Sequence, residues 1–171
     1  MDAGLFAVLI CEGLLILFGV YLIWSWITKT PFYPSKTKPL NDLIKELNLN
    51  GNLNFIDIGS GDGRIVMWGA KQGFNADGIE FNPFLTLYSR LLIFIRGLGK
   101  RAKIYNKDFN QHDYSKYNFA YLYIFPEHMD KISDKLFNEM QKGSVVVTNT
   151  FKFTTLSPDK TIGRYYIYYV K

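Results

Sequence analysis

The sequence predicts a doubly wound α/β domain with a mostly parallel sheet, preceded by one transmembrane helix. Three observations support this fold class. Strand-like and helix-like segments alternate along most of the chain, as in parallel sheets that carry helices on both faces. A glycine-rich turn joins the first strand to the next helix, and the most apolar stretch of the 171 residues lies at the N-terminus. This length suits one compact domain with one extra element.

The N-terminal apolar stretch, Leu5–Ile27, has the length and composition of a membrane-spanning helix. It would extend roughly 34 Å, enough to cross a hydrocarbon core of about 30 Å. Its single charged residue, Glu12, belongs near the outer headgroups, in a protonated state, or against a partner helix. A secretory signal peptide is the alternative, but no basic residue precedes the stretch and an aromatic belt (Tyr21, Trp24, Trp26) ends it.

The charges around this stretch predict its orientation. Three lysines follow it and none precedes it (Lys29, Lys36, Lys38). The positive-inside rule then places the main domain on the cytoplasmic side of an inner membrane, or in a mitochondrial membrane if the host is eukaryotic. We therefore predict a transmembrane anchor at residues 1–29 and a globular domain at residues 30–171, joined by a proline-containing linker.

The strands of the domain are predicted from short apolar runs bounded by turn residues. In chain order they are Leu53–Ile58, Ala76–Glu80, Ala102–Asn106, Phe119–Phe125, Val145–Thr150 and Tyr165–Val170. The run Phe119–Phe125 is apolar throughout, which is typical of a strand buried on both faces.

The helices are predicted from capping residues and apolar periodicity. They are Asn41–Leu49, Arg64–Gln72, Pro83–Leu98 and Glu127–Met140. Asn41 would cap the first helix, and Asn82 followed by Pro83 is an N-cap and N1 pair for the third. Gly73 and Gly143 would end the second and fourth.

The helix after Pro83 carries more apolar residues than one packed face requires. We expect one stripe to pack on the sheet (Phe84, Leu87, Tyr88, Leu91, Ile95, Leu98). Further apolar residues lie outside this stripe, with basic residues nearby (Leu85, Leu92, Ile93, Phe94; Arg90, Arg96, Lys100, Arg101). This mixture predicts contact with an anionic membrane surface. A neighbouring helix or a dimer partner is the alternative.

The strongest local pattern is the glycine-rich turn DIGSGDG at residues 57–63. Glycines let the backbone turn sharply and let a ligand approach closely. Open α/β sheets bind ligands at the carboxyl edge of their strands, where this turn would lie. Its candidate binding residues are Asp57, Gly59, Ser60, Gly61, Asp62 and Gly63.

The spacing of these glycines indicates S-adenosylmethionine rather than a dinucleotide. A dinucleotide fingerprint requires a third glycine at position 64, which is Arg64 here, and the third glycine comes one residue early. Asp57 and Asp62 would repel a pyrophosphate but suit a ligand with an ammonium and a sulfonium group. A P-loop is excluded because no glycine–lysine pair follows.

Three residues after the second and third strands extend the predicted cofactor site. Glu80 ends the second strand, where doubly wound folds place an acid against ribose hydroxyls. Asn82 is a further candidate contact beside it. Asp108 follows the third strand and is a candidate adenine contact, with a solvated loop acid as the alternative.

These residues resemble a group of class I, Rossmann-like methyltransferases. The matching segments are PFYPS, DIGSGDGRIV, GIEFNPFLTLYSR and KGSVVVTNTF. The group comprises the mitochondrial lysine methyltransferases of the ATP synthase c-subunit and of the adenine nucleotide translocase, with their archaeal protein-lysine methyltransferase relatives. The resemblance implies that Asp57, Glu80 and the turn glycines bind S-adenosylmethionine, and that a lysine side chain of a protein accepts the methyl group. The segment Thr155–Pro158 lacks the group's aromatic–proline pair.

A lysine acceptor must be neutral, although the pKa of lysine is about 10.4 in water. An apolar, aromatic pocket lowers that pKa by desolvation. Tyr33, Tyr123 and Phe125 are the candidates for this pocket, and a purely structural core role is the alternative for each. His128 or Glu127 would be candidate bases, with a role in the first helical turn as the alternative.

The composition argues against nucleic-acid and metal partners. The net charge is +5, but no run of five like charges occurs. One cysteine, Cys11, and two histidines without metal-ligand spacing offer no transition-metal site. We expect the substrate to be a membrane-associated protein. The alternatives are methyl transfer to a lipid or small amphiphile, and a non-catalytic membrane-anchored scaffold.

Overall fold

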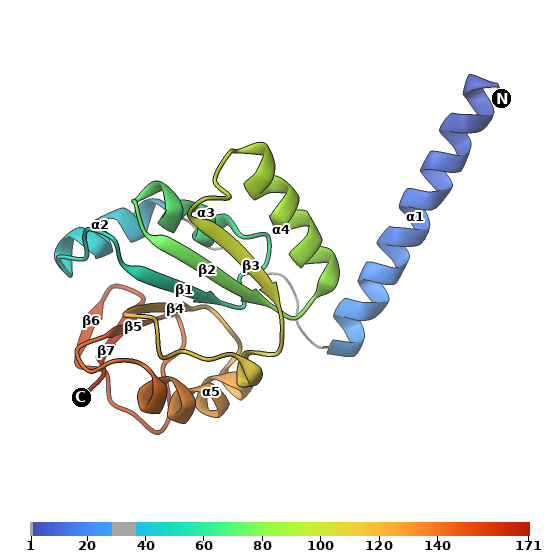
Figure 1. Ribbon diagram of the computed structural model, residues 1–171. Helices are drawn as coiled ribbons and strands as arrows, with labels where there is room; N and C mark the ends of the chain where they lie inside the picture. Colours follow the sequence, from blue (N-terminus) through green and yellow to red (C-terminus); the bar gives the residue numbers. More distant parts are fainter. Residues whose placement is uncertain (1, 29–36) are drawn as a thin grey trace. The chain divides into compact units, whose positions relative to one another are not determined.

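The computed structural model describes residues 2–28 and 37–171, and the chain forms two compact units. The first unit contains helix α1 (Ala3–Thr28), drawn in blue in Figure 1. Its segment Ala3–Ile23 is long and apolar enough to cross a membrane, and its side chains are not buried within the protein. The predicted apolar helix is therefore present, as a candidate span judged by length and composition.

The second unit is built on a seven-stranded sheet with the strand order β3-β2-β1-β4-β5-β7-β6. Strands β1 to β5 pair in parallel, and β7 is antiparallel to both β5 and β6. The strands are β1 (Asn54–Ile58), β2 (Asn75–Glu80), β3 (Ala102–Asn106), β4 (Phe119–Leu122), β5 (Val145–Asn149), β6 (Lys160–Ile162) and β7 (Tyr165–Tyr169). The predicted mostly parallel sheet is confirmed, with the short β6 as an additional strand.

Helices cover both faces of this sheet (Figure 1). They are α2 (Lys38–Glu46), α3 (Arg64–Lys71), α4 (Pro83–Ile95) and α5 (Pro126–Glu139), with a 3-10 helix η1 (Phe109–Gln111) between β3 and β4. Alternate residues of β1 enter different cores, as the pleat requires. Phe55 belongs to the core under α3, whereas Ile56 and Ile58 belong to the core that contains the buried face of α5.

Several predicted element ends differ in the structure. The strand predicted at Phe119–Phe125 ends at Leu122, because α5 begins at Pro126, and the helix predicted at Asn41–Leu49 ends at Glu46. Asn41 was expected to cap a helix, but α2 begins earlier, at Lys38, and the Asn41 side chain accepts a hydrogen bond from Trp68 Nε1 at 2.7 Å. Helix α4 ends at Ile95 rather than Leu98, because Gly97 takes a positive φ of 64° that stops the helix.

The predicted packing stripe of α4 is wrong. The residues buried against the sheet side are Thr86, Ser89 and Ile93. Four residues of the predicted stripe are exposed instead of buried (Leu87, Tyr88, Leu91, Ile95). Phe94 is exposed as well. Close approach to the glycine turn explains the small buried residues, since a Cβ at Gly63 would lie 2.9 Å from Ser89 Cβ.

Candidate functional site

The predicted site residues gather at the carboxyl edge of the parallel strands. The glycine turn follows β1, and Glu80 is the last residue of β2. The two strand ends are level, because Ile58 is paired with Ile79. Asp108 follows β3, and the segment with Tyr123 and Phe125 follows β4. Parallel strands thus bring residues from four separate parts of the chain to one edge.

The glycine turn has a backbone that only glycine adopts readily. Gly59, Gly61 and Gly63 have φ angles of 78°, 54° and 74°. A side chain at Gly59 would also place its Cβ 2.8 Å from Cγ2 of Ile124. The N–H groups of Gly59 and Ser60 donate to the carbonyl oxygen of Ile79, and the Gly61 N–H donates to a side chain.

The negatively charged group that fills this turn is the carboxylate of Glu80. Its Oε2 accepts a hydrogen bond from Gly61 N at 2.8 Å, and its Oε1 accepts one from Asn82 N at 2.7 Å. Glu80 is only 9% exposed. Burial raises the pKa of Glu80, and the backbone N–H donors partly oppose that rise. Each carboxylate oxygen has a second lone pair, so both oxygens retain acceptor capacity toward hydroxyl groups.

Asp57 is a second buried carboxylate beside Glu80. It is 3% exposed, and burial raises its pKa well above the ordinary value, with smaller contributions from Glu80 and Asp62 in the same direction. A positively charged ligand placed here would stabilise the ionised form of Asp57. The site therefore suits a cationic ligand and disfavours an anionic one.

Ser60 and Asp62 complete the turn in different ways. Ser60 Oγ is the single buried side-chain polar atom without a hydrogen-bond partner in the part of the chain that the structure describes. Such an atom is expected where a ligand or water supplies the partner. Asp62, in contrast, pairs with Arg64, whose Nη2 lies 2.7 Å from Asp62 Oδ2. Asp62 is therefore held by an ion pair within the turn.

Asn82 and Asp108 both cap helices. The side chain of Asn82 accepts hydrogen bonds from the N–H groups of Phe84 and Leu85 at the start of α4. Asp108 caps η1 by accepting from the Asn110 N–H at 2.9 Å. Both residues lie at the edge that carries Glu80, and their first role is to position the backbone there.

Aromatic side chains border the same edge beyond β4 and β5. The ring of Tyr123 stacks with Phe151, with 6.3 Å between the ring centroids. The Arg164 guanidinium lies 5.7 Å from the Tyr123 ring and donates a hydrogen bond to Asn149 Oδ1 at 2.6 Å. Phe125 is half-buried at the start of α5. The third pocket candidate, Tyr33, lies outside the described residues.

The family model described as "ANTKMT methyltransferase domain" matches residues 57–160. The chain belongs to this methyltransferase family. The matched segment starts at Asp57 and includes the glycine turn, Glu80 and the aromatic side chains after β4 and β5. The resemblance inferred from the sequence motifs is thereby confirmed.

Relatives of known name agree with this family. The human lysine N-methyltransferase of the ATP synthase c-subunit is 36% identical over 133 residues, which are 78% of this chain and 57% of that protein. A protein-lysine N-methyltransferase of Saccharolobus islandicus is 26% identical and covers 81% of this chain and 87% of its own length. The chain spans little more than half the length of the vertebrate relatives.

A solved structure confirms the fold. The structure described as an RNA methyltransferase from Salinibacter ruber, in complex with S-adenosyl-L-homocysteine, has a TM-score of 0.73 and 28% sequence identity. The matched region covers 81% of this chain and 94% of the Salinibacter ruber chain. The chain therefore has a class I methyltransferase fold.

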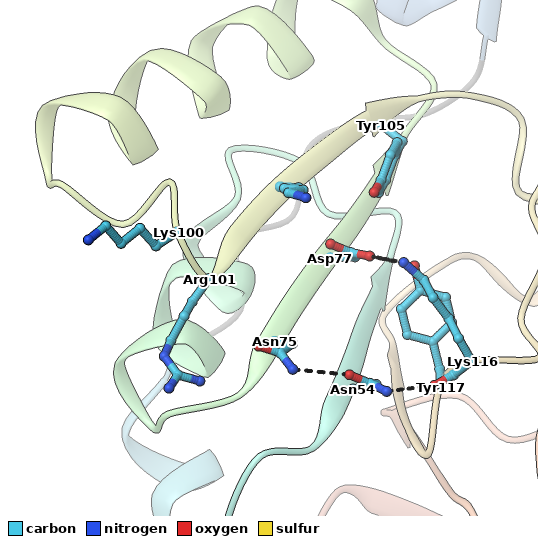
Figure 2. Close-up of a pocket in the computed structure, with 9 residues that line it drawn as sticks. Asn54, Asn75, Asp77, Lys100, Arg101, Tyr105, Lys116 and Tyr117 are labelled. Carbon is cyan, nitrogen blue, oxygen red and sulfur yellow. Dashed lines mark hydrogen bonds and ion pairs between the residues drawn. The ribbon is translucent and has the colours of Figure 1, made fainter.

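A separate polar pocket of about 160 Å³ lies toward the other end of the strands (Figure 2). Asn54 and Asn75, the first residues of β1 and β2, line it and bond to each other at 3.2 Å. Asp77 accepts hydrogen bonds from Lys116 Nζ and Tyr117 Oη, both at 2.7 Å. The lining extends along β3 to Tyr105 and includes neither the glycine turn nor Glu80.

Two residues of the carboxyl edge are missing from the sequence-based prediction. Phe151 and Asn149 lie at the end of β5 and contact the Tyr123 side of the site. Their position after a buried parallel strand was the available signal. Both residues lie in the segment KGSVVVTNTF, which resembles the family, but the motif alone assigned neither of them a role in the site.

Proposed function

We propose that this chain transfers a methyl group from S-adenosylmethionine to a lysine side chain of a membrane-associated protein. The carboxylate of Glu80 is the observation on which the proposal rests. It is held by two backbone N–H groups at the end of β2, directly beside the glycine turn that follows β1. A fixed, buried carboxylate with free lone pairs suits the two neighbouring hydroxyls of a ribose.

The remaining turn residues suit the rest of this cofactor. Asp57 would hold the cationic methionine end, since burial and its carboxylate neighbours make it favour a positive ligand. Ser60 Oγ would donate to or accept from the same end. Gly59, Gly61 and Gly63 would allow the backbone to approach the cofactor closely. Asp62 would hold the turn through its ion pair with Arg64. Asn82 and Asp108 would lie on either side of the nucleoside.

The acceptor pocket would lie on the Tyr123 side of the edge. S-adenosylmethionine supplies an electrophilic methyl group on a sulfonium. With this cofactor bound, the lysine ammonium would lose a proton to solvent. Its Nζ would then form the new bond to the methyl carbon as the sulfur–carbon bond breaks, and S-adenosylhomocysteine would leave. Tyr123 and Phe125 would exclude water from the acceptor lysine. Both desolvation and the nearby Arg164 charge would favour a neutral lysine.

The proposed membrane association is supported by α1. Its apolar segment would span a bilayer and keep the catalytic domain at the cytoplasmic or mitochondrial membrane surface. The relatives named for the ATP synthase c-subunit and the adenine nucleotide translocase support a protein lysine as the acceptor. The nearest alternative acceptors are a lipid and, from the described activity of the Salinibacter ruber protein, RNA.

The test uses full-length protein, S-adenosylmethionine with a radioactive methyl group, and membranes and ribosomal RNA from the source organism. Radioactivity is counted in protein, lipid and RNA extracts, and we expect it in protein. Asp57→Asn should lower the rate by about 10- to 100-fold, since a hydrogen bond to a charged group contributes about 1.5–3 kcal/mol. Asp42→Asn, at an exposed site on α2, is the matched control. Label confined to lipid or RNA would refute the proposal.

A further inference from the structure

The outward face of α4 is an unpartnered apolar surface. Leu87, Leu91 and Phe94 are 70%, 52% and 80% exposed, and Tyr88 and Ile95 complete the same face. The spacing of these residues places them on one side of the helix, opposite Thr86, Ser89 and Ile93. We refer to the five exposed residues as the α4 face. A contiguous apolar face of this kind marks an interaction site.

The segment of the chain that contains the α4 face is basic. Residues 81–107 contain six basic residues and no acidic one (Arg90, Arg96, Lys100, Arg101, Lys103, Lys107). Arg90 is held beside the face, where its guanidinium donates two hydrogen bonds to the carbonyl oxygen of Ile104. Arg96 follows the last turn of α4. An apolar helix face bordered by cations matches a bilayer surface that carries anionic lipids.

The connection between the two units makes such contact available. Helix α1 ends at Thr28 and α2 begins at Lys38. The nine residues between them reach at most about 33 Å when fully extended. A membrane that holds α1 would therefore keep the domain within reach of its surface.

We infer that the α4 face docks on the surface of an anionic bilayer, as a second membrane contact besides α1. Leu87, Leu91 and Phe94 enter the headgroup boundary, and Arg90, Arg96 and Lys100 contact lipid phosphates. This inference takes the membrane location from the proposed function and goes beyond it, because it concerns the catalytic domain itself. It requires no methyl transfer.

The test places one full-length chain in each nanodisc, which prevents pairing with a second copy. Two single-cysteine proteins are compared, each labelled with an environment-sensitive dye. The first carries the dye on the native Cys11, the sole cysteine, in the middle of α1. The second combines Cys11→Ser with Leu91→Cys. Lipids with a quencher near the headgroups or in the acyl chains report the depth of each dye.

Quenching of the dye at position 91 by headgroup-level quenchers is expected, at least about threefold stronger with anionic than with zwitterionic lipid. Charge reversal by Arg96→Glu with Lys100→Glu should remove that difference. A third single-cysteine protein, which combines Cys11→Ser with Lys142→Cys after α5, is the matched control, and its dye should stay unquenched. No quenching at position 91, or equal quenching in both lipids, overturns the inference. The Cys11 dye separates this failure from a failure of α1 to insert.

Discussion

Replacing Glu80 with alanine should destabilise the domain as well as weaken cofactor binding. The change removes the acceptors of two buried backbone N–H groups, those of Gly61 and Asn82. Hydrogen bonds to a charged group contribute about 1.5–3 kcal/mol each, so the gross loss is about 3–6 kcal/mol. Burial of the Glu80 carboxylate is itself unfavourable, as its raised pKa shows, so its removal offsets part of this loss. We expect a net decrease of about 2–4 kcal/mol in the free energy of unfolding.

The measurement is urea denaturation of the full-length protein in a non-ionic detergent, followed by near-ultraviolet circular dichroism of the aromatic core. With a slope of about 2 kcal/mol per molar urea, the midpoint should fall by about 1–2 M. Hydrogen exchange of the glycine turn should also accelerate. The matched control is Glu46→Ala, which removes an exposed ion pair with Lys160 and should shift the midpoint little. Equal midpoints for Glu80→Ala and Glu46→Ala would refute the reasoning.

Asp57→Asn should raise the melting temperature at pH 7 and have less effect near pH 4. The pKa of Asp57 is higher in the folded protein than its ordinary value of 3.8, so the folded state loses stability as the pH rises above 3.8, and asparagine removes this loss. The opposite pH trend would contradict this. Burial lowers the pKa of His112, so stability should fall as the pH drops below about 6.5, and His112→Gln should remove that dependence in thermal melts at pH 5 and 8. Gly78→Ala should cost about 1–3 kcal/mol in urea denaturation, because its Cβ would lie 2.7 Å from Ile104 and Val66 side-chain atoms. The control is Gly99→Ala, because a Cβ at Gly99 would have open space around it. Equal losses of stability in the two variants would show that the side chains around Gly78 move to accommodate the Cβ.

The fold and the cofactor side of the site follow from local sequence patterns. Apolar runs of strand length, with glycines after them, predict the parallel strands because both features act within a few residues. The turn at residues 57–63 was found for the same reason. Its three glycines have positive φ angles that no other residue type tolerates easily.

Tertiary contacts account for what the sequence did not predict. Helix α4 is apolar on most sides, so its periodicity could not indicate that Thr86 and Ser89 face the sheet. The buried face was set by the close approach of Gly63. Likewise, Asn41 has the residue type of an N-cap but bonds to Trp68, 27 positions away. The partners of the Glu80 carboxylate also depend on the folded edge rather than on local sequence.

The two acids at the carboxyl edge differ in what they contribute. Glu80 satisfies backbone donors, so its loss should affect folding and binding together. Asp57 is buried beside other carboxylates, so its charge should be unfavourable until a positive ligand arrives. A site that is strained in this way gains binding free energy from the ligand charge, at a cost in the stability of the free protein.

The most direct test of the account is the chemical identity of the methylated residue. Membranes labelled with the radioactive cofactor and full-length protein are delipidated, hydrolysed in acid, and analysed for methylated amino acids. The account predicts that the radioactivity co-elutes with mono-, di- or trimethyllysine and accumulates about 10- to 100-fold more slowly with the Asp57→Asn protein. Radioactivity in methylarginine, methylhistidine or a methylated nucleoside would contradict it.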